Sequence, residues 1–188
     1  MVNLPKEVRE EVKAEIFKRA DEYDYSKRSR SDNGRFMDTL VDDSKIGKRL
    51  QEHMEPAKVR TYIKDGVLHQ YTTEQRNRAF VSQCPKDLIK KHYNVETSVL
   101  SEQDGIIVCA TPESEIFVIS RGTVLKWETA VRKALDFITK NNRLIIRDEK
   151  PAIILQLVTT KADMTGADYK QIESALNMID IKVSFSDA

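Results

Sequence analysis

The chain has 188 residues, 40% of them hydrophobic, so it is long enough to bury a core, which excludes a largely disordered protein. Its 31 Lys and Arg side chains are balanced by 30 Asp and Glu, and the net charge of +1 excludes a histone-like polycation. No apolar run approaches the roughly 18–20 residues that a membrane span needs. Because Cys84 and Cys109 lie far apart without paired spacing, we expect free thiols in a reducing compartment, and a single disulfide is the alternative. Together these features predict a cytoplasmic protein without membrane contact.

The first half of the chain, residues 1–93, has the hydrophobic spacing of helices. Val8, Val12 and Ile16 recur on one stripe within a field of mixed charge, and similar stripes follow further along. A polar, turn-rich stretch at residues 26–34 predicts an exposed loop. We therefore expect a helical region that ends near residue 93.

The second half, residues 95–188, alternates short β-branched runs with two helical patterns. The predicted strands cover residues 105–110, 115–120, 144–146, 151–158 and 181–185, and the predicted helices cover residues 123–140 and 172–179. Short polar connections within the first two pairs of strands predict two antiparallel hairpins. The sequence therefore predicts an α+β fold in the order β-β-α-β-β-α-β, with a mixed five-stranded sheet and two flanking helices.

Two connections from a strand to a helix have the composition of phosphate sites. The first contains Arg121 and Thr123, and the second contains Lys161. Backbone N–H groups and the helix dipole favour an anion at a helix N-terminus, and a nearby cation supplies the balancing charge. Neither connection matches a Walker or dinucleotide pattern, so the alternative is that Thr123 is an ordinary helix N-cap.

A second basic cluster accompanies the predicted loop of the first half. It consists of Lys27, Arg28, Arg30 and Arg35. A flexible basic loop can contact phosphates while a neighbouring helix enters a groove. Acidic residues such as Asp32 are interleaved with these cations, so the alternative is a solvated charged surface.

A metal-dependent nuclease is the enzymatic alternative. Such an enzyme holds Mg²⁺ with two or three carboxylates and a lysine at neighbouring strand ends. Asp104 and Glu115 bracket the first predicted hairpin, and the α+β architecture is compatible with the restriction-endonuclease-like fold. However, no Asp is followed on the next strand by Glu-x-Lys, and Gln156 stands where that triplet needs an acid.

These features favour a binding function over catalysis. We expect a nucleic-acid-associated accessory protein of a prokaryotic or viral DNA or RNA transaction, of a regulatory or defence type, without a resident cofactor or metal. Its phosphate contacts would come from both basic regions, namely Lys27, Arg28, Arg30, Arg35, Arg121, Thr123 and Lys161. The alternatives are the Mg²⁺-dependent nuclease and a non-catalytic subunit that docks a protein partner or a second copy.

Overall fold

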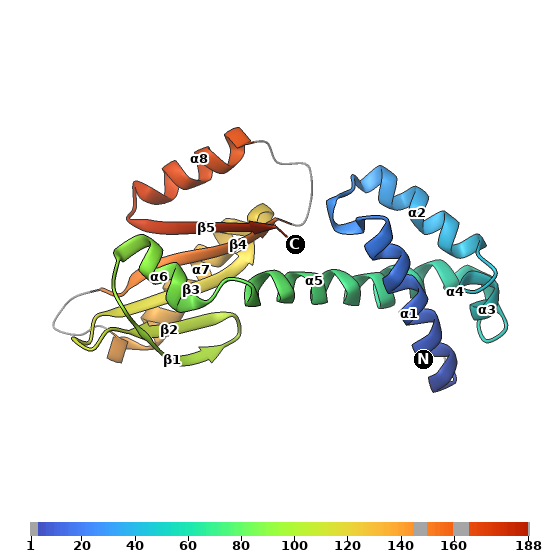
Figure 1. Ribbon diagram of the computed structural model, residues 1–188, viewed down its shortest axis with the longest axis horizontal. Coiled ribbons are helices and arrows are strands. Elements are labelled where there is room, and N and C mark those ends of the chain that lie inside the picture. Colours follow the sequence, from blue (N-terminus) through green and yellow to red (C-terminus); the bar gives the residue numbers. More distant parts are fainter. Residues whose placement is uncertain (1–3, 145–149, 160–165, 188) are drawn as a thin grey trace. The chain divides into compact units, whose positions relative to one another are not determined.

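The computed structural model of the chain describes residues 4–144, 150–159 and 166–187 (Figure 1). These residues form two compact units, of which the first ends at Gln75 and the second begins at Arg76. The division falls within α5 (His69–Val81), so this helix contributes residues to both units. None of the described helices is long and apolar enough to cross a lipid bilayer.

The first unit is helical and surrounds one apolar core. Besides the beginning of α5 it contains α1 (Lys6–Glu22), the 3-10 turn η1 (Tyr25–Lys27), α2 (Arg30–Asp42), α3 (Gly47–Gln51), α4 (Pro56–Thr61) and the π-helix η2 (Tyr62–Leu68). Val8, Val12 and Ile16 of α1 are buried, as their helical spacing predicts. Leu40 and Leu50 fill the same core from later helices, which confirms the predicted helical region.

The predicted loop at residues 26–34 is wrong beyond Ser29. This residue caps α2, because its hydroxyl accepts a hydrogen bond from the backbone N–H of Asp32 (3.2 Å). Ser, Asp and Asn favour helix N-caps as well as turns, so their abundance does not distinguish the two. Arg30 and Arg35 consequently lie on a helix.

The second unit contains a five-stranded mixed sheet in the order β1-β2-β3-β4-β5. Its strands are β1 (Ser98–Gln103), β2 (Ile106–Ala110), β3 (Ile116–Thr123), β4 (Ala152–Thr159) and β5 (Ile181–Asp187). β1, β2 and β3 form an antiparallel meander, whereas β3, β4 and β5 run parallel. The predicted α+β fold with a mixed five-stranded sheet is confirmed.

Helices cover both faces of this sheet (Figure 1). They are α6 (Pro85–Tyr93), α7 (Trp127–Lys140) and α8 (Gly166–Asn177), accompanied by the 3-10 turns η3 (Val124–Lys126) and η4 (Asn142–Leu144). Parallel crossovers of one hand place α7 and α8 on the same face, where Ala130 and Leu176 are buried. α6 covers the other face, where Ile89 packs in one cluster with Phe117 of β3.

The order of elements differs from the prediction at β1 and near Leu144. The prediction omits β1 because all six of its residues are exposed at the sheet edge, so no alternation of burial marks the strand. Leu144 lies in the turn η4, and the rest of the predicted strand at 144–146 lies outside the described residues. β4 pairs with two parallel neighbours, so the predicted second hairpin is wrong.

The compact units divide between Gln75 and Arg76, whereas the predicted division at residues 93–95 follows the change from helices to strands. α6 belongs to the second unit because Leu88 and Ile89 pack on the sheet. The end of α5 is attached to the same sheet by a hydrogen bond from Gln156 to the Phe80 carbonyl.

Candidate functional site

A pocket of about 380 Å³ opens at the carboxyl end of β3, entirely within the second unit. Three segments form it: the end of α5, the last residues of β3, and the chain from η3 into α7. Its charged and aromatic lining residues are Arg76, Phe80, Arg121, Lys126 and Lys133. We call this site the Arg121 pocket.

The pocket exists because β3 extends beyond the beginning of β2. The last pair of the β2–β3 ladder joins Ile106 to Ser120, and the N–H of Arg121 donates to the Gly105 carbonyl (2.9 Å). Alternate residues of a strand present their backbone groups to the same side. The backbone of Thr123 therefore faces the same side as that of Arg121, beyond the point where β2 begins.

The lack of a side chain at Gly122 lets α7 approach β3 closely. A Cβ atom at this position would lie only 2.8 Å from the Cβ of Ala130. The buried hydroxyl of Ser120 donates to the Ala130 carbonyl (2.9 Å) and ties the same helical turn to the strand. This packing brings Lys126 and Lys133 to the end of β3, where both line the pocket.

Arg121 is held by three neighbouring side chains. Its Nε atom donates to Oε1 of Gln156 (3.0 Å), and its guanidinium forms an ion pair with Glu102 of β1. The guanidinium also lies over the ring of Phe80, 5.5 Å from the ring centroid. Because the Arg121 side chain is only 15% exposed and already oriented, binding an anion to it costs little conformational entropy.

Gln156 positions Arg121 from the adjacent strand. It is the register partner of Arg121 on β4 and is fully buried. Its amide nitrogen donates to the carbonyl of Phe80 (3.1 Å), near the end of α5, where helix carbonyls lack intrahelical partners. Gln156, which the sequence has where a nuclease needs an acid, thus links the sheet to α5.

Three more cations surround Arg121, namely Arg76, Lys126 and Lys133. Lys126 is exposed at the N-terminus of α7. The ammonium of Lys133 donates to the backbone carbonyl of Asp104, a contact that leaves its positive charge unneutralised. A set of cations beside a helix N-terminus is suited to an anion such as phosphate.

A second pocket of about 480 Å³ adjoins the first along α7, and the two share Thr129 and Lys133. Arg132 adds a positive charge to this second pocket, while Asp104 and Asp136 add negative charges. The Arg121 pocket is therefore the more basic of the two, and the second pocket extends its surface along the helix.

Lysines recur every seven residues along this surface, at Lys126, Lys133 and Lys140. Seven residues make about two turns of an α-helix, so Lys133 and Lys140 lie along one side of α7. Lys126 is the N-cap of this helix and lines one pocket together with Lys133. Lys140 lines the second pocket, as Lys133 lines both. The seven-residue spacing is visible in the sequence, but these three lysines are not among the phosphate contacts predicted from it.

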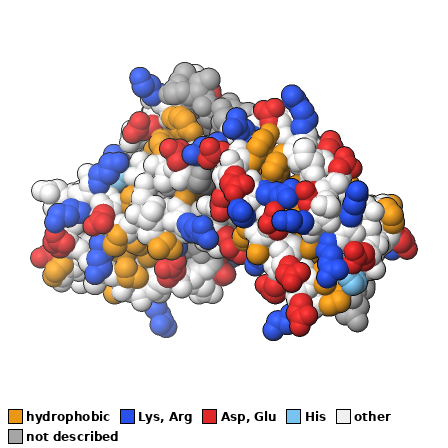
Figure 2. Space-filling view, turned by 45° about the vertical axis from the view of Figure 1, so that its right-hand side comes forward, with side chains coloured by type: hydrophobic (Ala, Val, Ile, Leu, Met, Phe, Trp, Pro, Cys, Tyr) orange, Lys and Arg blue, Asp and Glu red, His pale blue; other side chains and the backbone are white. Residues whose placement is uncertain are grey.

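The basic cluster of the first half lies on the surface of the helical unit. Lys27 and Arg35 pair with Asp24 and Asp32 respectively, each at 3.5 Å. Exposed ion pairs of this kind contribute up to about 1 kcal/mol, so a phosphate can replace them. Figure 2 shows how closely positive and negative side chains are interspersed over the face in view.

The other two arginines of this cluster differ in their surroundings. The Nε of Arg28 donates to the Tyr23 carbonyl (3.1 Å), and its guanidinium lies over the Tyr23 ring. Arg30 is exposed in the first turn of α2. Of the two, Arg30 can be replaced with less disturbance to its surroundings.

Asp104 and Glu115 lie at opposite ends of the β2–β3 hairpin. Asp104 precedes β2 beside the end of β3, whereas the Glu115 carbonyl accepts a hydrogen bond from Thr111, just past the end of β2. At about 3.3 Å per residue, the intervening strand separates them by roughly 20 Å. The expectation that they could share a metal ion is wrong, because an antiparallel hairpin places the residues before its two strands at opposite ends.

Thr123 and Arg121 line one pocket, as their proximity in the sequence suggests. Thr123 is the last residue of β3, and its side chain makes no helix-capping hydrogen bond. An ordinary N-cap therefore does not account for its side chain, since α7 begins at Trp127. Lys161 lies outside the described residues.

Comparison with known proteins gives no match: no protein-family model, no curated protein and no solved structure matches this chain. Among the residues that the structure describes, no three His, Cys, Asp or Glu side chains gather as a set of metal ligands. The chemistry of the Arg121 pocket is therefore the basis on which a function can be proposed.

Proposed function

We propose that this protein binds nucleic acid through the Arg121 pocket and serves as an accessory or regulatory protein in a DNA or RNA transaction. The observation that supports this proposal best is the gathering of Arg76, Arg121, Lys126 and Lys133 around one pocket. With a net charge of only +1, the chain has no general excess of positive charge to explain such a cluster. Lys and Arg are the side chains that contact nucleic-acid phosphates most often.

The extended row of lysines favours a polymer over a small anion. Lys133 and Lys140 are spaced by about 10 Å along α7, at 1.5 Å per residue, and Lys126 caps the N-terminus of the same helix. One inorganic phosphate cannot contact all three, whereas successive phosphates of a strand can. The adjoining second pocket continues this surface past Lys133.

The nuclease alternative loses the carboxylate pair on which it depends, since Asp104 and Glu115 lie at opposite ends of a hairpin. A non-catalytic subunit that docks another protein would not need the cations that line the Arg121 pocket. In the experiment that tests binding, Mg²⁺-dependent cleavage would favour the nuclease, and absence of both binding and cleavage would leave the non-catalytic subunit.

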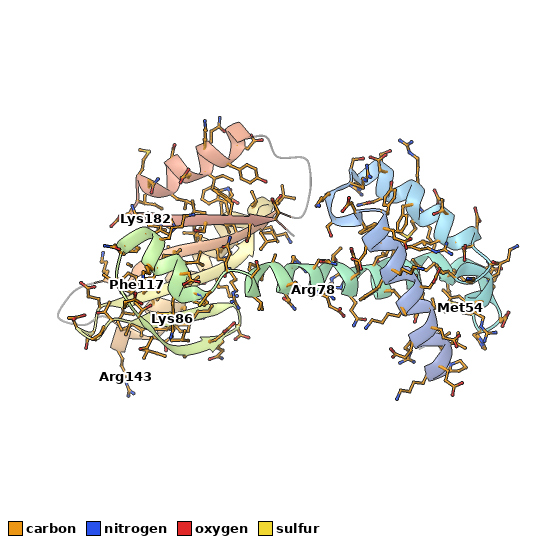
Figure 3. The ribbon with its side chains drawn as sticks, viewed as in Figure 1. Met54, Arg78, Lys86, Phe117, Arg143 and Lys182 are labelled. Atoms are coloured by element: carbon orange, nitrogen blue, oxygen red, sulfur yellow. The ribbon has the colours of Figure 1, made fainter. Side chains whose placement is uncertain are left out.

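The test is fluorescence anisotropy of labelled DNA and RNA, single-stranded and duplex, at low and physiological salt, with and without Mg²⁺, followed by gel electrophoresis of the nucleic acid. Lys126→Glu should weaken binding at low salt by about tenfold, because it replaces an attraction to phosphate with a repulsion. Lys86→Glu in α6, on the other face of the sheet, should have little effect (Figure 3). Both reversals lie at helix N-termini, where a negative charge is tolerated, so the pair is matched.

Binding that falls with salt and is weakened by Lys126→Glu alone would support the proposal. Equal effects of the two reversals would place the contact elsewhere. Absence of binding at low salt would contradict the proposal, and Mg²⁺-dependent fragments would favour the nuclease.

The basic cluster of the helical unit is a second proposed contact. Arg30→Ala should weaken binding a few-fold without changing the melting temperature, because the exposed side chain lies in the first turn of α2 and supports no core contact. The double change Arg28→Ala/Arg30→Ala should weaken binding further. Unchanged affinity in both variants would exclude this cluster from the interface.

A further inference from the structure

We infer that the Arg121 pocket receives one unpaired nucleotide, so that the protein binds single-stranded nucleic acid in preference to continuous duplex. This inference rests on the proposed function and specifies the form of nucleic acid that the same pocket recognises. Three features carry it: the aromatic wall of the pocket, its concave shape and the lysines that continue from it.

Phe80 gives the pocket a surface on which a base can stack. The half-buried ring lines the pocket and is fixed by the guanidinium of Arg121, which lies over it. The Phe80 backbone is fixed as well, through the hydrogen bond from Gln156. Aromatic side chains beside a basic groove are the usual means by which proteins hold single strands, because every base has a face that can stack.

The shape of the pocket also favours an unpaired nucleotide. A volume of about 380 Å³ lies near the lower end of the range for small-molecule sites. A continuous duplex keeps its bases stacked inside and presents its phosphates on a convex surface, so it can contact the rim of such a pocket but cannot fill it. A flexible strand can place one base beside Phe80 and its phosphate beside Lys126.

The backbone of β3 adds polar groups for the base edge. Thr123 presents its backbone on the side of the pocket, beyond the start of β2. Backbone groups at a strand end can bond to the edge of an exposed base, which is inaccessible in a paired one. From there the lysine row of Lys126, Lys133 and Lys140 provides contacts for neighbouring phosphates, as a single strand requires.

The test compares the affinity of the full chain for a labelled oligothymidine with its affinity for a blunt duplex of equal length. We expect the single strand to bind at least about tenfold more tightly, which corresponds to the binding free energy that one stacked base contributes. Phe80→Leu, which keeps an apolar side chain, should lower the single-strand affinity about tenfold and change the duplex affinity little. Phe185→Leu is the matched control, since this ring packs on Tyr169 and does not line the pocket.

A second measurement uses the unaltered protein and so does not depend on a variant that folds. Irradiation with an oligonucleotide carrying 5-iodouracil should crosslink the tryptic peptide 79–86, which contains Phe80. Preferential binding of the single strand, together with this crosslink, would support the inference.

Duplex bound as tightly as the single strand, or a crosslink that maps only to other peptides, would overturn the inference and leave nucleic-acid binding intact. The inference would also be overturned if folded Phe80→Leu bound the single strand as tightly as the unaltered protein does. No binding of either form would overturn both the inference and the proposed function.

Discussion

Arg121 and Gln156 face each other across the parallel β3–β4 pair, and the Nε of Arg121 donates to Oε1 of Gln156 over 3.0 Å. The same buried amide donates to the Phe80 carbonyl near the end of α5. One side chain therefore orients both a cation and an aromatic wall of the pocket. The integrity of the site depends on a residue that does not line it.

Replacing Gln156 tests this dependence. Gln156→Leu should lower the free energy of unfolding by about 2 kcal/mol, because the Phe80 carbonyl and the Arg121 guanidinium lose a buried partner. It should also weaken nucleic-acid binding, since Arg121 is no longer oriented. Urea unfolding and anisotropy measure the two effects. Gln171→Leu on the exposed surface of α8 is the control, and equal results for both variants would refute the role given to Gln156.

Glu102 competes with a bound anion for Arg121. Its carboxylate pairs with the guanidinium but is itself about half exposed, with 52% of the side chain accessible. Glu102→Gln should raise the affinity for nucleic acid up to about fivefold, as expected for release from a partly exposed ion pair. Glu113→Gln, at an exposed position in the turn between β2 and β3, removes an equal charge and should have a smaller effect. A weaker affinity in Glu102→Gln would show that the pair supports the site.

Gly122 is required for the close approach of α7 to β3. Gly122→Ala should destabilise the protein by about 1–3 kcal/mol, because the new Cβ would lie 2.8 Å from that of Ala130. Gly34→Ala in α2 makes the same change where no atom lies within 4 Å of the new Cβ. It should stabilise the helix by about 0.5–1 kcal/mol. Opposite shifts in urea unfolding are expected, and a neutral Gly122→Ala would show that the junction can relax.

His92 makes stability depend on pH. Burial lowers its pKa below the ordinary value of 6.5, assisted by the charges of Lys91 and Lys182 and opposed by Glu173. The unfolded chain therefore binds the proton more readily than the folded one. The contribution of neutral His92 to the free energy of unfolding is complete above about pH 6.5 and is lost as the pH falls through the lowered pKa. In urea unfolding, the free energy of unfolding should fall less between neutral and acidic pH for His92→Gln than for the unaltered protein. For the control His53→Gln, at an exposed position, the free energy of unfolding should fall as much as it does in the unaltered protein.

Much of the fold follows from local patterns. Stripes such as Val8, Val12 and Ile16, and the β-branched runs of β2 to β5, report burial directly and predict their elements. β1 gives no such signal because an exposed edge strand buries none of its side chains. Its pairing with β2 is fixed by the tight turn at Asp104–Gly105, where both residues have positive φ.

Only part of the site could be predicted from the sequence. Arg121 and Thr123 can be identified because the residues around a strand-to-helix junction are neighbours in the chain. Phe80 and Gln156 cannot, because they reach Arg121 from positions tens of residues away, across a helix end and a parallel strand. In the sequence, Gln156 even counts against a catalytic site, because an amide stands where the nuclease triplet needs an acidic side chain.

The salt dependence of single-strand binding tests the central claim most directly. Each phosphate contact contributes about −0.7 to the slope of log K against log salt concentration for single strands. Lys126→Ala/Lys133→Ala should therefore reduce the slope by about 1.4 and lower the affinity at low salt. The control Lys86→Ala/Lys170→Ala removes two exposed lysines from α6 and α8 and should leave the slope unchanged. A slope that is the same in both double variants and in the unaltered protein would contradict phosphate binding at the Arg121 pocket.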